Sequence, residues 1–111
     1  MSDLLTRHCQ PCESGAPPMP RARAQELLVQ IPGWAMNEPA TEISHTFRFK
    51  NYYETMAFVN ALAFVAHRED HHPDLEVGYN RVLVRLSTHS VKGLSDNDFI
   101  LAARIGHLLA D

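Results

Sequence analysis

Four histidines form the densest group of proton-exchanging side chains in this sequence: His67, His71 and His72, with His89 further along the chain. If the two strands that follow His72 form a hairpin that turns near Asn80, position 71 lies opposite position 89 at one rim of the sheet. Imidazole exchanges protons near neutral pH, so several imidazoles around one pocket suit general acid–base catalysis. Two other interpretations are open at this point: solvated or helix-capping histidines, and metal ligands.

Metal binding is the weaker of these interpretations. His67 and His71 are four residues apart and could share a helix face, as in a two-histidine zinc site. The glutamate that zinc hydrolases need in an HExxH motif is replaced by Arg68. Cys9 and Cys12 form a CxxC pair, but no second cysteine pair exists to complete four ligands. We therefore predict no metal site.

Other catalytic chemistry finds little support in the motifs. The sequence contains no GxSxG nucleophile elbow, GxGxxG turn or P-loop. Asp98 has the spacing of the N3 carboxylate in a capping box that begins at Ser95, and it could cap a helix and still face the pocket. His45 lies on the apolar face of an expected strand, which favours a partly buried structural role. His107, in the last expected helix, is interpreted as a surface or interface residue.

Hydrophobic periodicity predicts the elements that position these residues. Residues 42–50 alternate between apolar and polar, as do residues 75–79 and 82–86, which is typical of half-buried strands. Asn51, with Glu54 three residues later, predicts the start of a long helix. The expected elements are a helix at 20–31, strands at 34–36 and 42–50, a helix at 52–69, strands at 75–79 and 82–86, and a helix from 95. This order predicts an α+β fold, a four-stranded antiparallel sheet with about three helices on one face.

Length and composition limit the function classes. The chain has 111 residues, enough for one domain, and we expect it at 20–111 after a flexible CxxC lead-in at 1–19. Ten basic against thirteen acidic residues give a formal charge of −3, which argues against nucleic-acid binding. No apolar run approaches the length of a membrane span and no secretory signal opens the chain, so we expect a cytoplasmic protein. The apolar residues of helix 52–69 cover more of its circumference than one sheet can bury, which predicts a homodimer or homotetramer through this helix.

Several motifs together resemble the pterin-4a-carbinolamine dehydratase family. The chain carries His71-His72-Pro73, then Ser87-Thr88-His89, then Gly93-Leu94-Ser95 with Asp98. Upstream it carries Pro32-Gly33-Trp34, Phe47-Arg48-Phe49-Lys50 and Phe58-Val59-Asn60, in the family's order and spacing. The CxxC lead-in is similar to that of bacterial members. The resemblance runs from about residue 9 to residue 106.

The resemblance implies a lyase that dehydrates 4a-hydroxytetrahydropterin to quinonoid dihydropterin, without a metal or a bound cofactor. The family's place is in tetrahydropterin recycling for aromatic amino acid hydroxylation, which implies a functional link to such a hydroxylase. Transferred residue by residue, the catalytic set is His71, His72 and His89. The expected substrate-binding residues are Pro73, Thr88, Ser90, Val91, Asp98 and His67.

Position 67 departs from the animal members, which carry glutamate there. Replacing that carboxylate by the imidazole of His67 removes a negative charge that would favour imidazolium forms nearby. A second function class is a non-catalytic pterin-binding or dimerisation and coactivator module on the same fold. The three intact imidazoles at positions 71, 72 and 89 favour the enzyme, because a scaffold has no physical need for them.

Overall fold

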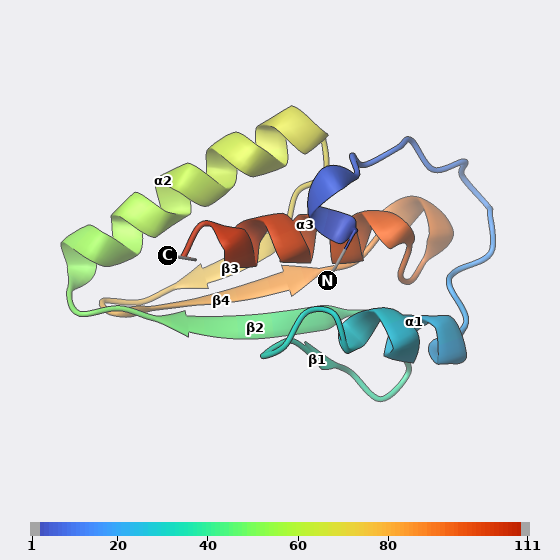
Figure 1. Cartoon of the computed structure of the whole chain (residues 1–111), viewed down its shortest axis with the longest axis horizontal. Coiled ribbons are helices and arrows are strands. Elements are labelled where there is room, and N and C mark those ends of the chain that lie inside the picture. The colour runs from blue at the N-terminus through green and yellow to red at the C-terminus, as the bar shows by residue number, and fades with distance from the viewer. Residues whose placement is uncertain (1–2, 110–111) are drawn as a thin grey trace.

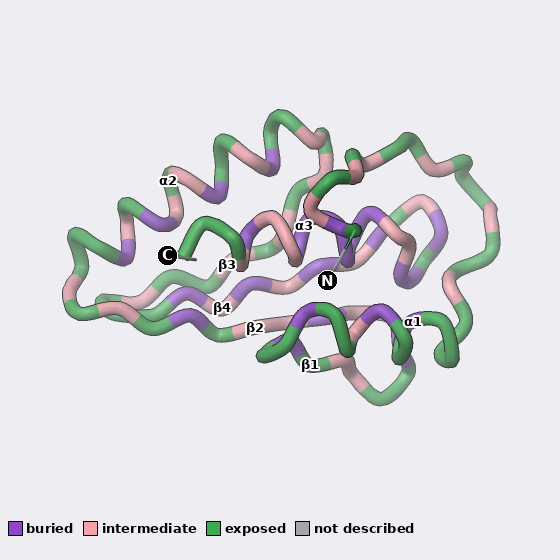
Figure 2. Tube along the Cα trace, viewed as in Figure 1, coloured by how far each residue is buried: buried purple, intermediate pink, exposed green. Residues whose placement is uncertain are grey.

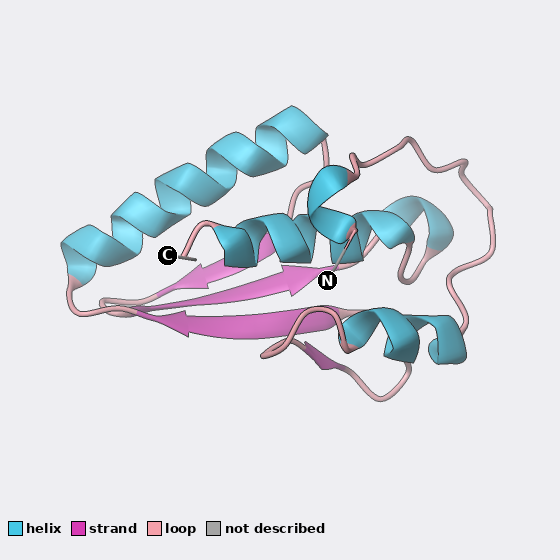
Figure 3. Cartoon of the chain, in the orientation of Figure 1, coloured by secondary structure: helices cyan, strands magenta, loops and turns pink. Residues whose placement is uncertain are grey.

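The computed structural model describes residues 3–109 and has the predicted α+β architecture (Figures 1 and 3). Within this described range, three α-helices accompany one four-stranded sheet. In chain order the elements are η1 (Leu4–Thr6), α1 (Arg21–Leu28), β1 (Ala35–Met36), β2 (Ile43–Arg48), α2 (Tyr52–Glu69), β3 (Asp74–Val77), β4 (Arg81–Leu86), η2 (His89–Val91) and α3 (Asp96–His107).

The sheet has the strand order β1-β2-β4-β3, with each neighbouring pair antiparallel. Asp74 pairs with Arg85 in the β3–β4 hairpin, so the centre of the hairpin lies between Tyr79 and Asn80. The expected turn at Asn80 is therefore displaced by half a residue. The hairpin still carries the chain after α2 back to the same end of the sheet (Figure 1).

Capping residues explain where the two long helices begin. Asn51 Oδ1 accepts from the Glu54 N–H at 2.8 Å, as the sequence predicts for the start of α2. Asp70 ends this helix in the left-handed conformation, at φ 52°. Ser95 and Asp98 form the predicted capping box at the start of α3.

The hydrophobic core lies between the sheet and the helices (Figure 2). One face of α2 contributes Phe58, Leu62 and Ala66 to it. Tyr53 and Phe64 lie on the outer side of α2 and are 83% and 63% exposed. These two side chains belong to the apolar surface for which the sequence predicts a partner subunit. No helix within residues 3–109 is long and apolar enough to cross a membrane.

The segment expected to be a flexible lead-in is packed against the domain over its first part. Leu4 is fully buried in the core, where η1 packs against α3. The Arg104 guanidinium donates to the Arg7 carbonyl at 2.5 Å, and the Cys9 N–H donates to Glu69 Oε1 at 2.7 Å. Contacts between residues far apart in the sequence, rather than a local period, hold residues 4–9 in place.

Candidate functional site

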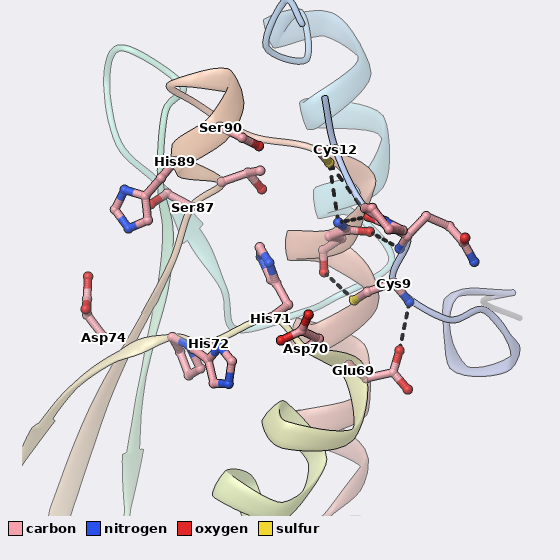
Figure 4. A pocket seen from close by; sticks show the side chains of 15 residues that line it. Cys9, Cys12, Glu69, Asp70, His71, His72, Asp74, Ser87, His89 and Ser90 are labelled. Atoms are coloured by element: carbon pink, nitrogen blue, oxygen red, sulfur yellow. Dashed lines mark hydrogen bonds between the residues drawn. The ribbon is translucent and has the colours of Figure 1, made fainter. Parts of the chain in front are cut away.

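A cavity of about 480 Å³ opens where α2 and β4 end (Figure 4). Three chain segments far apart in sequence line it, namely residues 9–12, 69–74 and 87–90, together with Asn97 of α3. All three predicted catalytic histidines, His71, His72 and His89, are among the lining residues. The structure therefore brings together the imidazoles that the hairpin argument places at one rim.

His71 is held in place by Asp98. Its Nε2 lies 2.6 Å from Asp98 Oδ1, and its side chain is 12% exposed. Asp98 is fully buried, and its other oxygen accepts from the Thr88 hydroxyl at 2.8 Å and from the Ser95 N–H at 3.0 Å. A carboxylate with this many donors is fixed in orientation, so it fixes the imidazole plane as well. Asp98 thus caps α3 and positions His71, although this fully buried carboxylate, expected as a substrate-binding residue, does not itself line the cavity.

His72 and His89 are exposed at the opening of the cavity. In Figure 4 their rings lie on the side of Asp74 and Ser87, whereas the ring of His71 lies deeper, between that side and Cys12. The local backbone explains why the rings of His72 and His89 lie apart from the ring of His71. The left-handed Asp70 turns the chain out of α2, and η2 begins at His89 directly after the bridge between Thr88 and Gly93.

The remaining predicted substrate-binding residues divide into two groups. Pro73, Thr88 and Ser90 line the cavity. Val91 is buried outside it, and His67 is exposed on α2 and is not among the lining residues. Both were expected at the site through the family resemblance, and neither reaches this cavity.

Sequence reasoning missed one wall of the cavity. This wall is formed by residues 9–12, and Glu69 and Asn97 line the cavity beside it. The CxxC spacing draws attention to Cys9 and Cys12, but as candidate metal ligands and as part of the family resemblance, not as a wall of the cavity. Within residues 3–109, no group of three or more histidine, cysteine or acidic side chains has a geometry that could hold a metal ion.

Two ionisable groups on this wall have shifted pKa values. Burial, followed by the negative charges of Glu69 and Asp98, raises the pKa of the Cys9 thiol to about 12. Burial acts to raise the pKa of Glu69 as well, but the Cys9 N–H, His8 and Arg104 outweigh it and leave the pKa below its ordinary value. Glu69 is therefore an anion and Cys9 a neutral thiol near neutral pH.

A family model described as pterin 4 alpha carbinolamine dehydratase matches residues 17–108. The chain belongs to this family. The match covers the sheet, the three helices and the histidine segments, and it confirms the resemblance drawn from the HHP and THxxxGLSxxD motifs.

Similar proteins agree with the family model. A protein of Nitrosomonas eutropha, provisionally named a pterin-4-alpha-carbinolamine dehydratase, is 55% identical over 96% of this chain and 94% of its own. A Stenotrophomonas maltophilia protein of the same provisional name is 56% identical over 97% and 96% of the two chains. A solved structure titled transcriptional coactivator/pterin dehydratase from Brucella melitensis superposes with a TM-score of 0.78 at 30% identity, covering 82% of this chain and 97% of that one. A pterin dehydratase-like RuBisCO assembly factor shares the fold at a TM-score of 0.62, covering 71% and 92%, with 24% identity.

Proposed function

We propose that this protein dehydrates 4a-hydroxytetrahydropterin to quinonoid dihydropterin by histidine acid–base catalysis. The observation that carries the proposal is the cavity in which a buried carboxylate positions His71 and the rim presents His72 and His89. Family membership supports the same substrate class. A cavity of about 480 Å³ lies in the usual range for sites that bind small organic ligands.

The reaction requires two proton transfers and no change of oxidation state. A base takes the proton from N5, the C4a–O bond breaks, and an acid protonates the departing hydroxyl so that it leaves as water. The electron pair of N5 forms the new N5=C4a double bond. Imidazoles in opposite protonation states perform both transfers near neutral pH, and we propose His71 and His89 as the main pair. This chemistry needs neither a metal nor a bound cofactor.

Stopped-flow absorbance of 4a-hydroxytetrahydropterin decay tests the proposal. The substrate also dehydrates spontaneously, so the measured quantity is the acceleration above that rate. We expect His71→Ala and His89→Ala each to remove most of it, by about a hundredfold for a lost acid–base group. His107→Ala, an exposed histidine of α3 outside the cavity, is the matched control and should retain full acceleration.

A spontaneous rate left unchanged by the intact, folded protein would overturn the enzymatic proposal. A pterin-binding module without catalysis would then be the better proposal. If the protein accelerates dehydration, we expect the reaction to help regenerate the tetrahydropterin that an aromatic amino acid hydroxylase consumes. That link is tested by coupling the two proteins and measuring whether hydroxylase turnover is sustained.

A further inference from the structure

The wall formed by Cys9, Gln10, Pro11 and Cys12 is fixed by the side chain of Asn97. Asn97 Oδ1 accepts from the Gln10 N–H at 2.9 Å, and its Nδ2 donates to the Gln10 carbonyl at 2.6 Å. The same Nδ2 lies 3.4 Å from Cys12 Sγ, while the Cys9 thiol donates to the Asn97 carbonyl at 3.6 Å. Asn97 is 8% exposed, so its polar atoms depend on these partners.

Glu69 provides the second anchor of the wall. Its side chain is 6% exposed and accepts from the Cys9 N–H at 2.7 Å. The two anchors stand next to His71 and its positioning partner Asp98 in the chain, because Glu69 is two residues before His71 and Asn97 is one residue before Asp98. The wall and the His71–Asp98 contact are therefore held by the same two elements, the end of α2 and the start of α3 (Figure 4).

The two cysteines occupy different environments in this frame. The Cys9 thiol donates its hydrogen bond to the Asn97 carbonyl, and burial beside two carboxylates keeps the thiol protonated. Cys12 is half-buried, its thiol donates to the Gln10 carbonyl at 3.8 Å, and it lines the same cavity as His71. In Figure 4, Cys12 and His89 lie on opposite sides of the cavity, with Ser90 between them. A flat heterocycle placed between them has an imidazole rim on one side and a polarisable sulfur on the other.

We propose that residues 9–12 are a substrate-binding wall of the site and that the Cys12 side chain contacts the bound pterin. This inference rests on the proposed function, since it takes the cavity as the pterin site. It makes the CxxC segment an affinity-determining part of the site, although this segment precedes the matched family region. Cys9 and Asn97 are positioning residues that hold the wall.

Binding of a 7,8-dihydropterin, a stable tautomer of the proposed product, tests this wall by titration of the intact protein. We expect Cys12→Phe, which fills the cavity, to raise Kd by about tenfold or more, whereas Cys12→Ser keeps the volume and stays within about threefold of the unmodified protein. Ser14→Phe is the matched control, because Ser14 is exposed and lies outside this cavity. Unchanged Kd in a folded Cys12→Phe variant would overturn the proposal.

Thiol alkylation gives a second measurement that needs no variant. We expect iodoacetamide to modify Cys12 faster than Cys9 in the native protein, and the dihydropterin to protect Cys12 with a half-maximal concentration equal to its Kd. If Cys12 is alkylated equally fast with and without saturating pterin, the proposal that residues 9–12 contact the pterin is wrong. The dehydratase proposal still holds in that case, provided that the protein accelerates dehydration. If the protein neither binds the dihydropterin nor accelerates dehydration, both the dehydratase proposal and the proposed pterin contact of residues 9–12 are wrong.

Discussion

Asp98 links three features of the site, because one buried carboxylate caps α3, accepts from Thr88 and holds His71. Asp98→Asn keeps the size of the side chain and an acceptor oxygen but removes the negative charge beside the imidazole. We expect it to lower the acceleration of dehydration by about tenfold to a hundredfold, the scale of a mispositioned acid–base group. Stopped-flow decay with a thermal melt separates this loss from unfolding.

Asp96→Asn is the matched control for Asp98. Asp96 occupies the first turn of the same helix but pairs with Arg7 at 2.9 Å outside the cavity. It should keep the acceleration of the unmodified protein. An Asp98→Asn variant as fast as Asp96→Asn would contradict the positioning role.

His67 occupies the position at which the family resemblance implies a glutamate in animal members. Its exposed position on α2, outside the cavity, means that a charge there acts on the histidines through solvent and is screened. We expect His67→Glu to move the pH–rate profile to higher pH, because a carboxylate favours imidazolium, by less than about one pH unit at low salt. Profiles that coincide at low ionic strength would contradict this expectation.

Residues 4–9 pack against the folded domain, with η1 against α3 and Cys9 against Glu69. Leu4 is fully buried against α3, so Leu4→Ala is expected to lower the free energy of unfolding by about 2–5 kcal/mol. Val29→Ala, at a position that is 81% exposed, is the control and should change it by less than about 0.5 kcal/mol. Urea unfolding measures both. Equal midpoints for the two variants would show that η1 is not part of the folded unit.

The end of α2 makes stability depend on pH through Glu69. Its folded-state pKa lies below the ordinary value of 4.5, so its carboxylate stabilises the fold above that pH and the stabilisation is lost as pH falls through the folded value. We expect Glu69→Gln to be less stable than the unmodified protein at pH 7, and the difference to be smaller at a pH below 4.5. Glu26→Gln, exposed on α1, is the control. A difference that is the same at both pH values would contradict the linkage.

The elements with strong local signals were predictable from sequence, and the wall of the site was not. Asn51 and the alternation around β2 are encoded within a few residues, and α2 runs over the predicted 52–69. The pairing of Asn97 with Gln10 joins positions 87 residues apart, and no local pattern reports such a contact. Asp98 has one role of each kind. Its capping of α3 could be predicted from its spacing to Ser95, whereas its contact with His71 depends on the fold and could not.

At the scale of the whole molecule, α2 presents an apolar stripe that nothing within the described chain covers. Tyr53 and Phe64 are eleven residues apart, close to three helical turns, so they share one outward face with Ala57. The Arg68 guanidinium lies 5.7 Å from the centre of the Phe64 ring, and Phe64 is still 63% exposed. Burial of such a stripe against a second copy is favourable by about 25 cal/mol for each Å² of apolar surface removed from water.

We therefore expect a homo-oligomer that associates through α2, with a mass in light scattering that is a multiple of 12.5 kDa at micromolar concentration. Phe64→Lys places a charge in the stripe and should shift the protein toward the single-chain mass. Val29→Lys, at an even more exposed apolar position just after α1, should not. Association also makes the melting temperature rise with protein concentration, and Phe64→Lys should abolish that dependence. A single-chain mass for the unmodified protein would contradict the prediction, and the exposed stripe would then be a property of the folded monomer.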